Sequence, residues 1–142
     1  MSSHCLWPWD SLSARAQAYP ATEIIVSDDA SQDNSCEVVS SYISRGYGIC
    51  LLRNPHGGMA ANLNAAYQSS CGDLICQLDA DDTFLPGKIE AVVKAFLAHP
   101  AAGFAIHRAS LSGWNRSTTS KRSIRSLARH SPASSAIRFI SR

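Results

Sequence analysis

Three short apolar runs, each followed by a polar cluster and then by a helical pattern, constrain the fold of this 142-residue chain most strongly. The runs are residues 23–28, 48–52 and 73–78, and residues 103–107 are a fourth candidate strand. Short aliphatic and β-branched runs are typical of strands that are buried on both faces. Since strands that alternate with helices are joined by right-handed crossovers, the pattern predicts an α/β fold with a parallel-rich sheet and flanking helices.

Four helical patterns lie before, between and after these runs. The first is residues 11–18, and the second opens at Asn34, where Asn34 and Glu37 resemble a capping box. The third has apolar residues at helical spacing from Met59, and the fourth begins at Pro86, which suits the first turn of a helix. The regular alternation of elements stops after about residue 108.

Charge divides the chain at about the same place. Residues 1–90 hold eleven acidic and four basic side chains, a net charge of −7, whereas residues 91–142 hold nine basic side chains and no acid. Residues 109–142 include ten serines, with residues 122–129 as the one candidate for a short basic helix. We therefore expect a domain over residues 11–108 and a basic, Ser/Arg-rich, poorly ordered tail over residues 109–142.

Composition excludes several classes of protein. No run approaches the roughly 18 apolar residues that a membrane span needs, and Met1–Asp10 does not have the pattern of a secretory signal. The five cysteines are an odd number without paired CxxC spacing, which fits neither a disulfide framework nor a zinc ribbon. A cytoplasmic protein with reduced thiols is the expectation.

Two acidic clusters directly follow predicted strands: Asp28-Asp29 and Asp79–Asp82. The carboxyl ends of parallel strands meet at one edge of the sheet, where open α/β sheets bind ligands. Asp79 and Asp81 are two residues apart in an extended segment, so their carboxylates converge and repel each other unless a cation lies between them. Oxygen ligands favour Mg²⁺ or Mn²⁺, and a site with few protein ligands leaves positions open for phosphate oxygens. The sequence therefore predicts a metal site at Asp79, Asp81 and Asp82.

Acids at strand ends have a second interpretation, in which they cap helices and stay solvated. We prefer this interpretation for Asp33 and Asn34. Three acids within residues 79–82, directly after an apolar strand, are not explained by capping.

Three segments in this order resemble family 2 glycosyltransferases, which have the GT-A fold. They are residues 23–33 (EIIVSDDASQD), the segment from Asn54 to Ala66, and the segment from Gly72 to Ile89. The resemblance covers roughly residues 11–108. It implies a Rossmann-like core that binds a nucleotide-diphosphate sugar, most often a UDP-sugar, together with Mn²⁺ or Mg²⁺, and transfers the sugar to an acceptor that the sequence does not identify.

The resemblance also implies roles for single residues. Asp29, in an Asp-Asp-x-Ser pattern, matches the acid that pairs with the nucleotide base, and residues 79–81 match the DxD motif. Arg53 and Asn62 fall in the region that lines the pocket, although a solvated strand-end base and a surface position on a helix are equally good interpretations. The candidate nucleotide-sugar contacts are Asp28, Asp29, Ser31, Arg53, Asn62 and Asp79.

The chain departs from the family pattern at both ends. The family opens with a buried strand, which has no counterpart in Met1–Asp10, and it supplies an acidic general base after the DxD region, whereas no acid follows Glu90. We therefore expect a glycosyltransferase-like domain that is truncated at both ends and inactive for want of the base. The alternative is a non-catalytic nucleotide- or metal-binding fragment.

The basic tail raises a further alternative, in which it contacts an anionic partner. It has no recognisable nucleic-acid motif, so no specific nucleic-acid partner is expected. The remaining anionic partner is the inner face of a membrane, which the lysines and arginines of the tail would contact peripherally.

Overall fold

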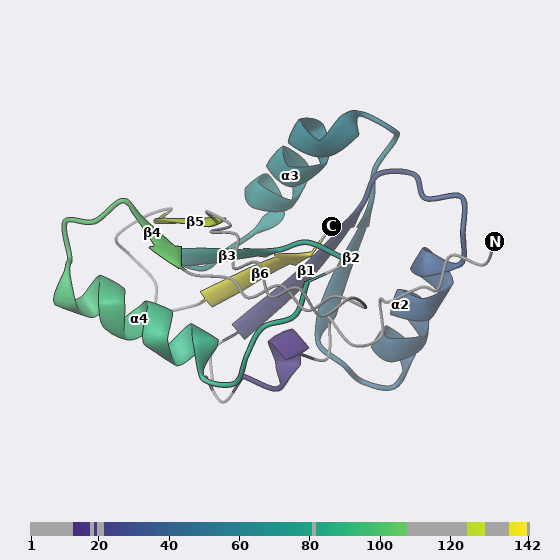
Figure 1. The fold of residues 1–142 in the computed structure, drawn as a ribbon. Helices are drawn as coiled ribbons and strands as arrows, with labels where there is room; N and C mark the ends of the chain where they lie inside the picture. Colours follow the sequence, from purple (N-terminus) through teal and green to yellow (C-terminus); the bar gives the residue numbers. More distant parts are fainter. Residues whose placement is uncertain are drawn as a thin grey trace, which may run out of the picture.

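The computed structural model describes residues 13–17, 19, 22–80, 82–107, 125–129 and 137–141. Its strands form one sheet in the order β2-β1-β6-β3-β5-β4 (Figure 1). Their bounds are β1 Thr22–Asp28, β2 Ile49–Arg53, β3 Leu74–Leu78, β4 Phe104–His107, β5 Arg125–Arg129 and β6 Ile137–Ser141. The helices are α2 Ser35–Ser44, α3 Gly58–Ser69 and α4 Lys88–Ala98, and residues 13–15 form a helical turn. The predicted α/β class, with a parallel sheet and flanking helices, is confirmed.

Strand direction places several strand ends at one edge of the sheet. β2, β1, β6 and β3 run parallel to one another, and β5 is antiparallel to both β3 and β4. Asp28 at the end of β1 is in register with Arg53 at the end of β2. The loops that leave β1, β2 and β3 therefore start from the same edge.

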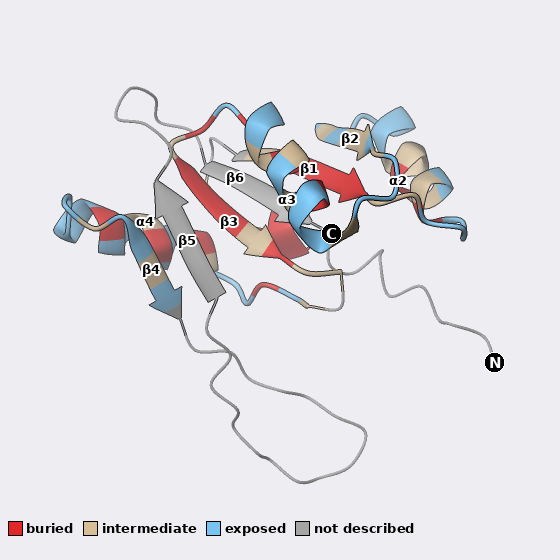
Figure 2. Ribbon diagram, turned by 90° about the horizontal axis from the view of Figure 1, so that it is seen from above, coloured by how far each residue is buried: buried red, intermediate tan, exposed pale blue. Residues whose placement is uncertain are grey.

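The two faces of the sheet carry different helices (Figure 2). Alternation along the strands sends Ile24 and Val26 into a cluster with α2 and α4, and sends Ile25 into a cluster with α3. The first cluster contains Val39 from α2 and Ile89, Val92 and Phe96 from α4. The second contains Ala66 of α3 and Ile75 of β3.

Two strands come from the segment for which the sequence predicts a poorly ordered tail. Residues 125–129, within the candidate basic helix, are extended instead, because they pair antiparallel with β3 on one side and β4 on the other. Residues 137–141 form β6, which lies between β1 and β3 and pairs parallel with both. The rest of residues 109–142 lies outside the described residues.

β6 joins two parts of the sheet. Among the described strands, it alone pairs with both β1 and β3, and Phe139 at its centre is in register with Ile24 and Cys76. Through it, the strand that leads to Asp29 is fixed relative to the strand that leads to Asp79.

Helix starts differ in detail from the sequence expectations. The capping box is wrong, because the Asn34 side chain makes no capping hydrogen bond. The neighbouring Asp33 instead accepts a hydrogen bond from the Ser35 N–H at 2.9 Å. α4 starts after Gly87, whose φ of +75° is a backbone conformation that glycine adopts without strain, so Pro86 lies in the preceding turn. None of the helices in the described part of the chain has the length and hydropathy of a membrane span.

Candidate nucleotide and metal site

Asp28 and Asp29 at the end of β1 point to opposite faces of the sheet. Asp28 is only 6% exposed, and its Oδ2 accepts a hydrogen bond from the Ser31 N–H at 3.1 Å. Its carboxylate lies on the α2 side of the sheet, near Cys36. Burial raises the pKa of the Cys36 thiol most, and the Asp28 carboxylate raises it further. Asp28 therefore closes the β1–α2 loop by accepting a hydrogen bond from the backbone of Ser31. Ser31 itself is an exposed residue.

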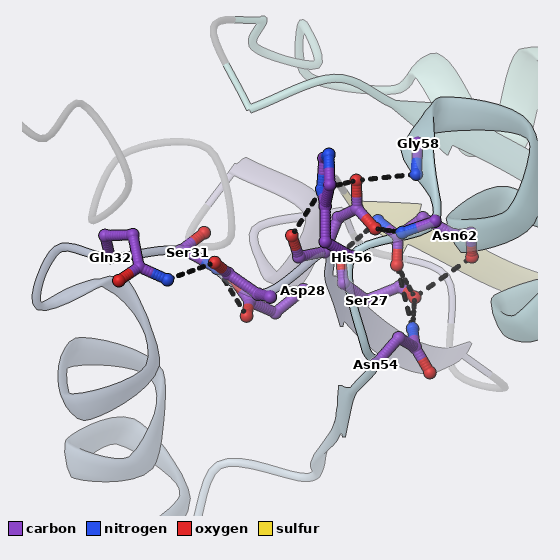
Figure 3. Close-up of polar contacts among 11 residues, drawn as sticks. Ser27, Asp28, Ser31, Gln32, Asn54, His56, Gly58 and Asn62 are labelled. Atoms are coloured by element: carbon purple, nitrogen blue, oxygen red, sulfur yellow. Dashed lines mark hydrogen bonds and ion pairs between the residues drawn. The ribbon is translucent and has the colours of Figure 1, made fainter.

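Asp29 binds the start of α3. Its Oδ1 accepts the Gly57 N–H at 2.7 Å and its Oδ2 accepts the Gly58 N–H at 3.0 Å. His56 Nδ1 lies 3.1 Å from the same Oδ2 (Figure 3). The Gly57 N–H lowers the pKa of Asp29 most, with smaller contributions from His56 and Gly58 against an opposing effect of desolvation. The carboxylate thus satisfies two amides at the positive end of a helix.

Asn62 of α3 belongs to a buried polar network with Ser27 and Asn54. Its side chain is 1% exposed, and its Oδ1 accepts hydrogen bonds from Ser27 Oγ and Asn54 Nδ2, each at 2.8 Å. Its Nδ2 donates to the Ser27 carbonyl at 2.8 Å (Figure 3). The interpretation of Asn62 as a surface position is therefore wrong. The network fixes the end of β1 to α3 and to the residue that follows β2.

Arg53, the last residue of β2, lies on the α2 face of the sheet, whereas α3 covers the other face. Its side chain is exposed, and Nη2 donates to Ser40 Oγ of α2 at 3.3 Å. The structure thus holds Arg53 against α2 and Asn62 against the end of β1, although the sequence placed both in one pocket lining.

Asp79 and Asp82 are joined in one turn after β3. The Asp82 N–H donates to the Asp79 carbonyl at 3.0 Å, and Asp79 Oδ1 accepts a hydrogen bond from Gln77 Nε2 at 2.9 Å. Oδ2 of Asp82 is shielded from solvent. Asp81 lies outside the described residues, so its predicted role as a metal ligand stays a prediction.

The donor set of this turn fits a hard divalent cation. Among the described residues, no group of three or more His, Cys, Asp or Glu side chains is placed to hold a metal ion, and the described carboxylates of this turn are those of Asp79 and Asp82. Mg²⁺ in proteins is often held by one or two carboxylates, with waters and substrate phosphates in the other positions. The carboxylate oxygens of the turn are donors suited to such a cation, whereas zinc prefers nitrogen and sulfur ligands.

The Asp29 contact predicts a specific pH dependence. A carboxyl with a lowered pKa in the folded state contributes stability above its unfolded pKa and loses it as the pH falls through the folded pKa. We therefore expect Asp29→Asn to bind up to one proton fewer on unfolding below about pH 4. Thermal melts of both proteins from pH 6 to pH 2.5 measure this. Asp33→Asn, which removes another carboxyl of lowered pKa beside a helix start, is the matched comparison. An acid limb unchanged by Asp29→Asn would contradict the role of Asp29 at α3.

Sequence reasoning missed the groups that hold the predicted site residues. Ser27, Gly57 and Gly58 were not among the candidates, although all three contact candidate residues. The sequence favours a turn over a phosphate cradle for Gly57-Gly58, but the pair stands at the start of α3, where it is the local signal for an anion-binding helix start.

Comparison with known proteins relates the chain to glycosyltransferases. The family model described as glycosyl transferase family 2 matches residues 11–138. Chondroitin synthase and hyaluronan synthase of Pasteurella multocida are each 34% identical over 85 residues, which is 60% of this chain and 9% of each synthase. A glycosyltransferase of Rickettsia prowazekii that is named as uncharacterized is 38% identical over 78 residues, or 55% of this chain and 24% of the relative. No solved structure gives a significant match.

The match to the family model includes both acidic clusters and most of the described strands. It extends past residue 108 into β5 and the beginning of β6. The chain spans less than a third of the length of these curated relatives. On the match over residues 11–138, the chain belongs to glycosyl transferase family 2.

Proposed function

We propose that this chain binds a nucleotide-diphosphate sugar, with UDP as the preferred nucleotide, through Mn²⁺ or Mg²⁺, and so forms the donor site for glycosyl transfer. One observation carries the proposal: Asp29 and the Asp79–Asp82 turn follow strands β1 and β3, which end at the same edge of the sheet. Family membership supports a sugar nucleotide as the ligand of this edge.

Asp29 is proposed to bind the base. Its two oxygens accept the Gly57 and Gly58 amides, but an ionised carboxylate has about four lone-pair positions. Capacity therefore remains for the imide N–H of a uracil. Because Asp28 and Asn62 are engaged in the β1–α2 loop and the buried network, their proposed contribution is to hold Asp29 in place. Ser31 and Arg53 are proposed contacts at the exposed rim.

Asp79 and Asp82 are proposed to hold the divalent cation and, through it, the diphosphate, with Asp81 as a third ligand. A bound cation supplies charge stabilisation for the nucleoside diphosphate that leaves during transfer. The protein's part is to keep two carboxylates in one turn, where the Asp82 N–H and the Asp79 carbonyl are joined.

UDP titration by calorimetry, with and without Mn²⁺, tests the proposal. Asp79→Asn is expected to weaken UDP binding in Mn²⁺ by about 10–100-fold, a range typical of disturbed metal sites. Glu90→Gln is the matched control, because it removes one negative charge from an exposed side chain of α4 that pairs with Lys94. Absence of UDP binding by the unmodified chain, or equal effects of the two variants, would overturn the proposal.

Turnover separates the two functions that the sequence leaves open. Release of free sugar from a UDP-sugar, or its transfer to an acceptor, supports a transferase. Binding without either reaction favours a non-catalytic nucleotide- and metal-binding fragment.

A further inference from the structure

The helical turn at residues 13–15 and the residues after it touch the loop that leads from the acidic turn to α4. Ser13 and Gln17 are buried, at 9% and 8% exposure, in a part of the chain far from that loop in sequence. Ser13 Oγ accepts the Phe84 N–H at 3.1 Å. The Phe84 side chain is itself part of the core between the sheet and α4, so both the ring and the amide of this residue are fixed.

Gln17 makes three hydrogen bonds with its amide. Nε2 donates to the Leu85 carbonyl at 3.1 Å and to the Ser13 carbonyl at 3.0 Å, and Oε1 accepts the Ile89 N–H at 3.3 Å. The N-cap of α4 is Gly87, which has no side chain to bind the first amides of the helix. Gln17 therefore supplies the acceptor that a capping side chain would otherwise provide.

These contacts hold the loop on both sides of Leu85. Phe84 is two residues from Asp82, whose amide closes the turn with Asp79. A displacement of the loop at Phe84 is therefore carried directly into the position of the Asp82 carboxylate. A buried amide with all its groups satisfied has one low-energy position, which makes it suited to setting the position of a loop.

We propose that Ser13 and Gln17 are positioning residues that set the Asp79–Asp82 turn for the cation and the diphosphate. The inference rests on the proposed function. Binding of the base and binding of the diphosphate can then be tested separately. The base end depends on Asp29, which accepts the Gly57 and Gly58 amides at the start of α3. Loss of Gln17 should thus weaken recognition of the diphosphate and spare recognition of the nucleoside.

Two probes distinguish positioning from general stability: uridine alone, and UDP with Mn²⁺. Gln17→Met keeps the side-chain volume and removes all three hydrogen bonds. We expect it to weaken UDP–Mn²⁺ binding about tenfold, to leave uridine binding unchanged, and to speed amide exchange at Phe84 and Ile89. Gln68→Met is the matched control, since Gln68 is an exposed residue of α3, and should change neither affinity.

Each result decides the matter. Equal losses for uridine and UDP, or a UDP affinity unchanged by Gln17→Met, would overturn the positioning role while the donor-site proposal stands. Failure of the unmodified chain to bind UDP would overturn both. If Gln17→Met does not fold, Ser13→Ala, which removes the acceptor of the Phe84 amide, gives the same comparison with an expected loss of about threefold.

Discussion

Phe139→Pro is expected to lower the free energy of unfolding by about 3 kcal/mol and the melting temperature by about 10 °C. Phe139 is the central residue of β6, which has hydrogen-bonded neighbours on both sides. In such a strand every N–H faces a partner, so proline removes a ladder hydrogen bond and leaves a carbonyl unpaired. The loss falls on the strand that joins β1 to β3, and we therefore expect UDP–Mn²⁺ binding to weaken with it.

A second variant distinguishes the effect of losing the Phe139 side chain from the effect of losing its backbone N–H. Phe139→Val keeps the N–H and a residue that favours strands, so it should retain most of the stability that proline loses. Chemical denaturation of the three proteins measures the difference. Equal stability of the proline and valine variants would show that β6 is not paired between β1 and β3.

Much of the fold is predictable because its elements have strong local patterns. β1 to β4 and the helices between them fall within a few residues of their predicted bounds, since each apolar run or helical stripe is read from neighbouring residues. β5 and β6 have no such signal. β6 is the five-residue run IRFIS and β5 the run RSLAR, and both are extended because of the strands beside them. Pairing between distant strands is a tertiary effect that overrides local preference.

The candidate site divides in the same way. The positions of Asp29 and Asp79 at strand ends are predictable from the runs that precede them. The long-range contacts around them are not predictable, because Asp29 meets Gly57 across 28 residues and Gln17 meets Ile89, beyond the acidic turn, across 72. Local sequence therefore predicts which side chains lie at the edge of the sheet, and long-range hydrogen bonds decide how Asp29 is held.

Asn62→Ala is expected to lower the free energy of unfolding by about 3 kcal/mol. The change removes one acceptor shared by Ser27 Oγ and Asn54 Nδ2 and one donor to the Ser27 carbonyl, all in a buried site. Each lost hydrogen bond costs about 1 kcal/mol on average, and more where the remaining partner is buried without water. Urea denaturation measures the loss.

Asn64→Ala is the matched control, since Asn64 is an exposed residue of the same helix two positions away. It should change stability by less than about 0.5 kcal/mol. A double-mutant cycle of Asn62→Ala with Ser27→Ala should then give a coupling of about 1 kcal/mol, because both variants break the same Ser27–Asn62 hydrogen bond. Equal effects of Asn62→Ala and Asn64→Ala would mean that the network does not hold the β1 end. The Asp29 carboxylate would then depend on the α3 amides alone, and the base end of the site would lose its buried support.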